Sequence, residues 1–281
     1  MPAKKMTVAV AQFSLSADIS ANLRFYLRYI REAGKRGASL IVFSELSLCG
    51  FGPVDWKDWR KVDYQELADA EERVRSALGE SGLWGVMGTA KYQSSRKKPF
   101  NSAVFVDPNG RERASYNKIF GTPVELGYYS RGEHFTVLNI NDLRVGSLIC
   151  YDFRFPELYR EYLKKDVRVM VHPFYQPGRP PYRDGLSHIA PIHIQSRAAE
   201  NCMFVIAPNY GGRDSAWGSM IVNPDGEIML RLARGRSCMG IAEIELDPFL
   251  SGWGEVRRQN ARRASRGHFV PLTEKEAGKY E

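Results

Sequence analysis

Short apolar runs alternate along the chain with segments of helical spacing, and this alternation constrains the fold more than any other feature of the sequence. The expected strands are residues 7–13, 40–45, 86–92, 103–107, 112–118, 144–150, 167–171, 203–208, 219–222, 228–232 and 238–246. The expected helices are residues 20–34, 64–78, 156–164 and 192–200. Strands that are interspersed with helices predict an α/β protein built in layers.

Two hairpin turns resemble one another and suggest two related halves that are rich in strands. Asp107-Pro-Asn-Gly110 and Asn223-Pro-Asp-Gly226 each separate two strand-like runs. The chain has no linker rich in Pro, Gly and Ser that would divide it. We therefore expect one domain over residues 1–250, followed by a loosely packed basic tail over residues 251–281 that is a candidate for contact with another subunit.

Composition excludes several classes of protein. No apolar run approaches the roughly 20 residues that a membrane-spanning helix needs. The N-terminal segment alternates like a strand and lacks the pattern of a secretory signal. The four cysteines are scattered without a CxxC pair, which argues against a metal site. We expect reduced thiols, a cytoplasmic location, no membrane partner and no metal or organic cofactor.

The net charge of +8 raises the question of an acidic partner. Five arginines and one glutamate lie between Glu255 and Arg266, so much of the excess is local. The chain carries no recognisable nucleic-acid-binding motif. We interpret the basic segment as solvated or in contact with another subunit, and we do not expect nucleic acid as a partner.

Cys150 ends an apolar run and precedes a turn into the helix expected from Pro156. Strand ends in α/β proteins are where sites are built, and a nearby helix start favours the thiolate. A free cysteine is more often a small buried hydrophobic residue, and we interpret Cys49, Cys202 and Cys238 in that way. Cys150 is thus a candidate nucleophile that needs a base or cation to activate it.

Two charged residues offer what such a nucleophile requires. Glu45 closes the apolar run 40–45, and Lys118 ends the run 112–118. Each residue alone fits a surface role. Amide hydrolysis needs a nucleophile, a proton carrier and a positive group near the developing oxyanion. The chain shows no Cys–His motif and no GxSxG motif, which leaves a Glu–Lys–Cys set as the simplest combination.

Six segments occur in this order along the chain: SELSLCGF (44–51), YNKIF (116–120), the segment 125–132, ICYDFRFPEL (149–158), RAAEN (197–201) and the segment 217–226. Together they resemble motifs of the nitrilase-like carbon–nitrogen hydrolases. The resemblance runs from Val8 to about Leu246. It implies a four-layer αββα sandwich of two mixed sheets and association as a homodimer or larger homo-oligomer.

The resemblance also implies the roles of the site residues. Glu45, Lys118 and Cys150 take the places of the catalytic glutamate, lysine and cysteine. Glu125 takes the place of a second glutamate that positions substrate and lysine. The implied reaction is the hydrolysis of a non-peptide amide through a thioester, with Lys118 and the backbone N–H of Tyr151 holding the oxyanion.

The chain departs from the family pattern at Ser44, where proline is frequent, and at Phe51, where tyrosine is common. Nitrilases of the family tend to carry Trp after the cysteine, whereas this chain has Tyr151. The segment around Cys150 is more similar to amidases and N-carbamoyl-amino-acid hydrolases. In N-carbamoyl-D-amino-acid hydrolases an arginine at the place of Arg154 contacts the substrate carboxylate, so the resemblance implies that Arg154 selects a linear amide that carries a carboxylate. An ion pair with Asp152 or Glu157 is the alternative role for Arg154.

Three other functions stay open. An acyltransferase would use the same triad to pass the thioester to an amine, and a nitrilase would attack a nitrile. A non-catalytic binding protein on this fold would use the basic tail. The Pro-rich segment 173–191 is expected to shape or cover the pocket.

Overall fold

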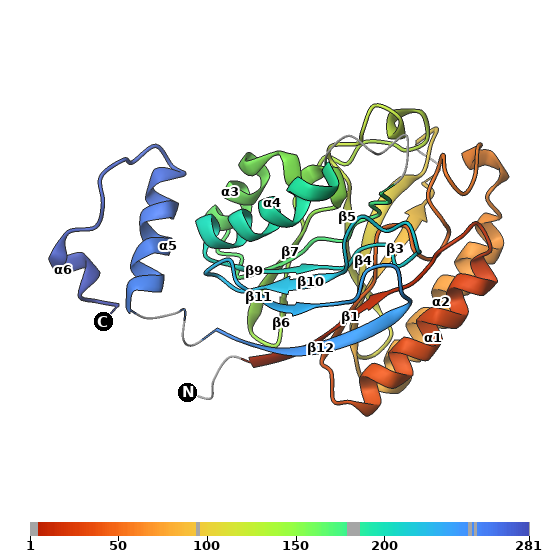
Figure 1. The fold of residues 1–281 in the computed structure, drawn as a ribbon, viewed down its shortest axis with the longest axis horizontal. Coiled ribbons are helices and arrows are strands. Elements are labelled where there is room, and N and C mark those ends of the chain that lie inside the picture. Colours follow the sequence, from red (N-terminus) through yellow and green to blue (C-terminus); the bar gives the residue numbers. More distant parts are fainter. Residues whose placement is uncertain (1–4, 94–95, 179–185, 247–248, 250–251, 281) are drawn as a thin grey trace.

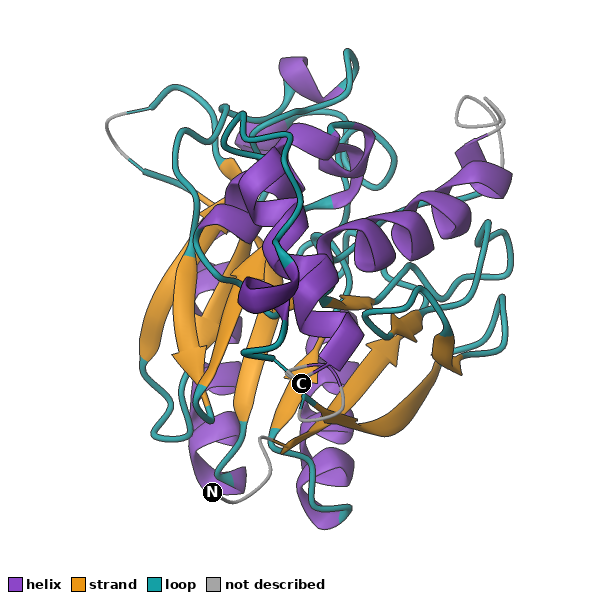
Figure 2. Ribbon diagram, turned by 90° about the vertical axis from the view of Figure 1, so that its left-hand side faces the viewer, coloured by secondary structure: helices purple, strands orange, loops and turns teal. Residues whose placement is uncertain are grey.

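The computed structural model describes residues 5–93, 96–178, 186–246, 249 and 252–280. Two six-stranded sheets face one another, and helices cover the outer face of each sheet (Figures 1 and 2). The predicted four-layer αββα sandwich of two mixed sheets is therefore confirmed.

The strands are β1 (Lys5–Gln12), β2 (Leu40–Val42), β3 (Trp84–Lys91), β4 (Phe100–Val106), β5 (Glu112–Asn117), β6 (Val137–Ile140), β7 (Leu143–Ser147), β8 (Val169–Val171), β9 (Phe204–Ala207), β10 (Met220–Val222), β11 (Ile228–Arg231) and β12 (Cys238–Glu245). The α-helices are α1 (Ile19–Lys35), α2 (Tyr64–Ser81), α3 (Pro156–Lys164), α4 (Leu186–Asn201), α5 (Gly252–Ala264) and α6 (Glu274–Ala277). The short 3₁₀ helices are η1 (Trp59–Lys61), η2 (Glu125–Gly127) and η3 (Cys150–Arg154).

The two sheets have the same connectivity. One sheet has the order β12-β1-β2-β3-β4-β5 and the other the order β6-β7-β8-β9-β10-β11. In each sheet three parallel strands are followed by an antiparallel hairpin, and an antiparallel strand closes the other edge. The two sheets therefore share one strand arrangement, as the two similar hairpin turns suggested. β12 takes the edge position in the first sheet that β6 takes in the second.

The two hairpin turns are built alike. In each turn one side-chain oxygen, from Asp107 or from Asn223, accepts hydrogen bonds from the backbone N–H groups two and four residues ahead. Gly110 and Gly226 lie at positive φ, where a glycine avoids strain. The turns therefore repeat their backbone geometry as well as their sequence.

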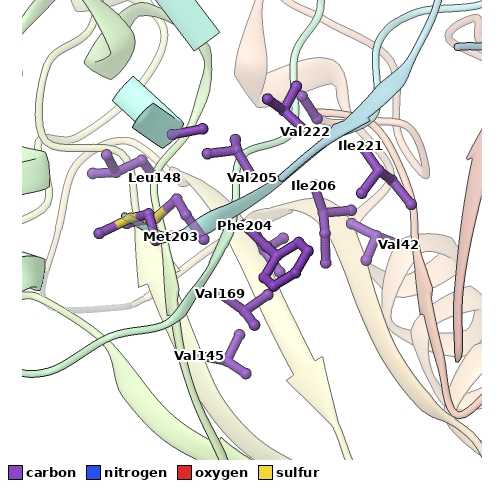
Figure 3. Close-up of a cluster of buried hydrophobic side chains, with 14 of the residues drawn as sticks. Val42, Val145, Leu148, Val169, Met203, Phe204, Val205, Ile206, Ile221 and Val222 are labelled. Atoms are coloured by element: carbon purple, nitrogen blue, oxygen red, sulfur yellow. The ribbon is translucent and has the colours of Figure 1, made fainter. Parts of the chain in front are cut away.

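The central strands, such as β2, β8, β9 and β10, are apolar along their whole length because both faces of each sheet are buried there. Along β1, Val8 and Val10 pack into the core between the sheets, whereas Ala9 and Ala11 pack under α1 and α2. Figure 3 shows the core between the sheets, where Val42 of one sheet lies near Ile206 of the other. This double burial explains why the strand signals in the sequence are continuous and not alternating.

Two of the expected strands end three residues earlier than predicted. The strand of residues 40–45 stops at Val42, and the strand of residues 144–150 stops at Ser147. Glu45 and Cys150 therefore lie just beyond the carboxyl ends of β2 and β7. The sequence analysis did not predict β6, which pairs with β7 across the turn Asn141-Asp142.

The first part of the C-terminal segment, which was predicted to be a loosely packed tail, is anchored to the body of the protein. Residues 252–264 form α5, which contacts α3 and α4. The side chain of Arg258 is fully buried, and its Nη1 donates to the carbonyl oxygens of Asn201 and Cys202 at 3.0 and 3.2 Å. Its Nη2 donates to the Val167 carbonyl at 2.9 Å and to the Asp166 carboxylate at 3.0 Å.

The other arginines of this basic segment are mostly paired with acids as well. Arg257 contacts Asp225, Arg262 contacts Asp166 and Arg263 contacts Glu276. The segment is thus an anchored helix whose charge is largely matched by the body of the protein. Whether its outer face contacts another subunit stays a prediction.

Among the described residues, no helix is both long and apolar enough to cross a membrane.

Candidate active site

The four candidate catalytic residues lie on loops or short turns that follow strands of both sheets. Glu45 follows β2, and Lys118 directly follows β5. Glu125 begins η2, and Cys150 begins η3 just beyond β7. The first three come from one half of the chain and the last from the other, so the site forms where the two halves meet.

Lys118 joins two buried carboxylates. Its Nζ lies 2.7 Å from Oε1 of Glu45 and 2.6 Å from Oε1 of Glu125. All three side chains are almost fully buried. A cation held between two carboxylates in a dry environment is fixed in position, because every movement would break a charge-assisted hydrogen bond.

Asn101 and a backbone amide complete this cluster, and the sequence analysis identified neither. The Asn101 side-chain amide donates to Glu45 at 2.7 Å and to Glu125 at 3.3 Å. The backbone N–H of Tyr175 donates to the second oxygen of Glu45 at 2.7 Å. The available signal for Asn101 was a polar residue inside a strand that is otherwise buried. A backbone donor leaves no such signal in a sequence.

Burial and mutual charge set the proton affinities of this cluster. Burial raises the pKa of Glu45, and the carboxylate of Glu125 raises it further against the opposing effect of Lys118. Burial disfavours the charge on Lys118, yet the two carboxylates hold its pKa well above the ordinary value. Burial also raises the pKa of the Cys150 thiol, with Glu45 adding to the effect and Lys118 opposing it. The resting site thus combines a neutral thiol, a lysine cation and a carboxylate with raised basicity.

The nucleophile candidate sits on a strained turn. Cys150 has φ of 42°, in the left-handed region that residues with a side chain rarely adopt. Its N–H donates to the Pro173 carbonyl at 2.8 Å, and its Sγ lies 3.9 Å from the Tyr175 carbonyl oxygen. The segment that follows β8 therefore holds both Cys150 and Glu45, because Tyr175 also binds the Glu45 carboxylate.

Asp152 connects the cysteine turn to the lysine segment. One carboxylate oxygen accepts from the N–H of Phe120 at 2.8 Å. The other accepts from the Tyr116 hydroxyl at 2.8 Å and from the N–H of Ile149 at 3.0 Å. Burial raises the pKa of Asp152 to about 6 despite these donors. Asp152 thus ties the two loops that carry Cys150 and Lys118.

Arg154 lies at the end of η3, four residues after Cys150, and is half-buried. Its guanidinium lies 5.4 Å from the centre of the Phe153 ring. Within the described part of the chain, Arg154 forms no ion pair with Asp152 or Glu157, the two partners suggested for its alternative role, and both of its roles stay predictions. Residues 179–185 of the Pro-rich segment lie outside the described residues, so its predicted covering role stays a prediction.

Comparison with known proteins identifies the family. A family model for carbon–nitrogen hydrolases matches residues 7–249. The chain belongs to the carbon–nitrogen hydrolase family. The predicted family is thus confirmed, and so is the prediction of an amidohydrolase that acts on carbon–nitrogen bonds other than peptide bonds.

Relatives within the carbon–nitrogen hydrolases are distant but span nearly the whole chain. The omega-amidase NIT2 of Xenopus tropicalis is 27% identical over 279 residues, which cover 94% of this chain and 96% of that protein. The N-carbamoylputrescine amidase of Solanum lycopersicum is 26% identical, covering 90% of this chain and 91% of that protein. A solved amidase structure from Nesterenkonia sp. has a TM-score of 0.77 at 23% sequence identity, covering 92% of this chain and 97% of that chain.

Proposed function

We propose that the chain hydrolyses a small linear amide or N-carbamoyl compound through a thioester on Cys150, with Glu45 as proton carrier and Lys118 as the cation at the oxyanion. The observation that carries the proposal is the buried bridge from Glu45 through Lys118 to Glu125 beside Cys150. A carboxylate, a cation and a thiol in one dry cluster are the three groups that amide hydrolysis needs.

The first half of the reaction forms the thioester. Glu45 takes the proton from Sγ as the sulfur attacks the carbonyl carbon of the amide. The carbonyl oxygen becomes an oxyanion, which Lys118 and the N–H of Tyr151 stabilise. The C–N bond then breaks, and the leaving nitrogen takes the proton from Glu45 and departs as ammonia or an amine.

The second half releases the acid. Water gives a proton to Glu45 as its oxygen attacks the thioester carbonyl, and the same two donors hold the new oxyanion. The C–S bond breaks, and Glu45 returns the proton to the sulfur. Glu125 and Asn101 hold Lys118 and Glu45 in position throughout.

The proposed substrate class rests on Arg154 and on the relatives. A guanidinium four residues after the nucleophile, in the same short helix η3, suits a substrate that carries a carboxylate. Relatives of this chain include omega-amidases, N-carbamoylputrescine amidases and a nitrilase of Pyrococcus abyssi. The solved amidase from Nesterenkonia sp. AN1 has been captured with butyramide, which is a small linear amide. A homo-oligomeric assembly and a cytoplasmic location also remain proposals.

A panel of linear amides, N-carbamoyl amino acids and nitriles tests the proposal. We expect the wild-type protein to release ammonia from members of the first two classes, and Cys150→Ala to stay folded and release none. Mass spectrometry of rapidly quenched reactions should show an acyl group on the Cys150 peptide. Activity in Cys150→Ala would contradict the proposal. A product formed only when an amine is added would indicate acyl transfer instead.

The acid limb of the pH–rate profile should reflect Glu45. Because the pKa of Glu45 is raised above 4.5, kcat/KM should fall as the pH drops through a value above 4.5. The negative charge of Glu125 contributes to that raised pKa. In Glu125→Gln we therefore expect the acid limb to move to lower pH, together with a lower maximal rate. An acid limb that stays in place or moves to higher pH would show that Glu45 is not the group that titrates.

A further inference from the structure

A buried histidine that the proposed mechanism does not use lies against the backbone of the nucleophile. His172 follows β8 and has no exposed surface. Its Nε2 lies 3.1 Å from the carbonyl oxygen of Cys150. Its Nδ1 lies 2.6 Å from the hydroxyl of Tyr159, a fully buried residue of α3.

The two contacts define the protonation of the ring. A carbonyl oxygen only accepts hydrogen bonds, so Nε2 carries the ring proton and donates a hydrogen bond to the carbonyl oxygen of Cys150. The neutral ring then has a lone pair on Nδ1, which accepts from the Tyr159 hydroxyl. Burial lowers the pKa of His172 to about 3, which keeps the ring neutral at ordinary pH. Stacking on the Phe174 ring, with centroids 4.5 Å apart, fixes the ring plane.

The backbone of the cysteine turn is paired at nearly every polar group. The N–H of Ile149 donates to Asp152, and the N–H of Cys150 donates to Pro173. The carbonyl of Cys150 accepts from His172. Among the residues that the structure describes, the N–H of Tyr151 has no hydrogen-bond partner.

One peptide plane connects the histidine to that N–H. The carbonyl of Cys150 and the N–H of Tyr151 belong to the same peptide bond, which is planar and trans, so they point in opposite directions. Fixing the oxygen therefore fixes the direction of the N–H. The positive φ of Cys150 makes this peptide costly to hold, and such a conformation persists only where its surroundings determine it.

We propose that His172, oriented by Tyr159, is a positioning residue that holds the Cys150–Tyr151 peptide so that the Tyr151 N–H faces the oxyanion. The proposal rests on the proposed function in that it assigns this N–H to the oxyanion. It adds a buried, hydrogen-bonded Tyr159–His172 pair to the groups that influence the reaction. This pair affects the attack on the substrate carbonyl and not the reactivity of the Cys150 thiol.

Two reactions of Cys150 separate these effects. Acylation by p-nitrophenyl acetate passes through an oxyanion, whereas reaction with methyl methanethiosulfonate occurs at sulfur and forms none. Both are followed as the mass added to the Cys150 peptide, which distinguishes Cys150 from the other thiols. Acylation by p-nitrophenyl acetate can be measured even if the chain does not hydrolyse amides. Failure of the proposed function would appear instead as no ammonia release by the wild-type protein from the substrate panel. The two failures are therefore distinguishable.

We expect His172→Phe, which keeps an aromatic ring on Phe174, to slow acylation by roughly 10- to 100-fold. This is part of the 100- to 1000-fold effect of losing an oxyanion donor. The thiosulfonate reaction should stay within about twofold of wild type, since it needs no oxyanion donor. For amide hydrolysis, kcat should fall and KM should change little, because the lost interaction acts in the transition state.

Two further variants and a control refine the test. His172→Gln, whose side-chain amide can donate near the position of Nε2, should recover most of the lost rate. Tyr159→Phe should show an intermediate loss, because Nδ1 then loses the donor that selects the tautomer. Tyr162→Phe is the matched control, since its buried hydroxyl on the same helix binds the Ser147 carbonyl and not the histidine.

The pattern of rates decides the outcome. Slower acylation with an unchanged thiosulfonate reaction supports the proposal. Equal loss of both reactions in His172→Phe would show a role in the thiol or in the fold as a whole and would overturn it. Unchanged acylation in this variant would overturn it as well.

Discussion

Replacing Glu45 with Gln should lower kcat for amide hydrolysis by more than about 1000-fold while leaving the protein folded. Loss of one oxyanion donor costs roughly 100- to 1000-fold, and general acid–base catalysis contributes roughly 100- to 10,000-fold. Glu45 serves as base in one step and as acid in the next, so its loss exceeds that of a single donor. Gln keeps the shape of the side chain, and its single amide oxygen can accept either from Lys118 or from the N–H of Tyr175, which bind different oxygens of Glu45.

Glu71→Gln is the matched control for this variant. Glu71 is a half-buried carboxylate of α2 whose pKa is raised by burial, but it accepts from the hydroxyl of Thr89 on β3 and does not belong to the site. We expect the control to keep wild-type kcat. Steady-state ammonia release, with circular dichroism to confirm folding, measures both variants. Comparable activity in Glu45→Gln and wild type would remove Glu45 from the mechanism.

Replacing Arg258 with Met should destabilise the protein by about 3–5 kcal/mol, because three backbone carbonyls would lose their donor at a cost of about 1–3 kcal/mol each. The buried guanidinium supplies hydrogen bonds to three backbone carbonyls and to Asp166. Methionine fills much of the volume but satisfies none of these acceptors. Because α5 contacts α3 and α4, the loss should affect the body of the protein and not the tail alone.

The neighbouring residue provides the control for this prediction. Arg257 carries the same charge, but its pair with Asp225 is well exposed, and such pairs contribute about 0–1 kcal/mol. Chemical denaturation of wild type, Arg257→Met and Arg258→Met should therefore separate the two positions clearly. Equal effects would show that burial of Arg258 does not determine the stability of this region.

The sequence indicates candidate residues for the site but not the groups that position them. Glu45, Lys118, Glu125 and Cys150 stand in recognisable motifs, and the structure brings Lys118 within hydrogen-bond distance of both glutamates. The groups that hold them in place were harder to predict. Several are backbone atoms, such as the N–H of Tyr175, and the residue type says nothing about where a backbone group points.

Other errors have identifiable physical causes. The cluster of arginines in α5 has the composition of a solvated segment, and only the contacts of Arg258 show otherwise. The strand β6 is short and partly exposed, so its apolar signal is weak. Asn and Asp tolerate positive φ better than most residues, so the pair Asn141-Asp142 is a sequence signal for a hairpin turn and could have revealed β6. Both residues do lie at positive φ.

The pairing of β12 with β1 has a consequence for how the chain is synthesised. Lys5 lies opposite Glu245, and Gln12 lies opposite Cys238, so β1 is synthesised long before the strand that covers its edge. Until β12 is available, β1 presents an open edge that can pair with another nascent chain. We therefore expect the growing polypeptide to depend on chaperones until β12 has been translated, however early α1 and α2 form.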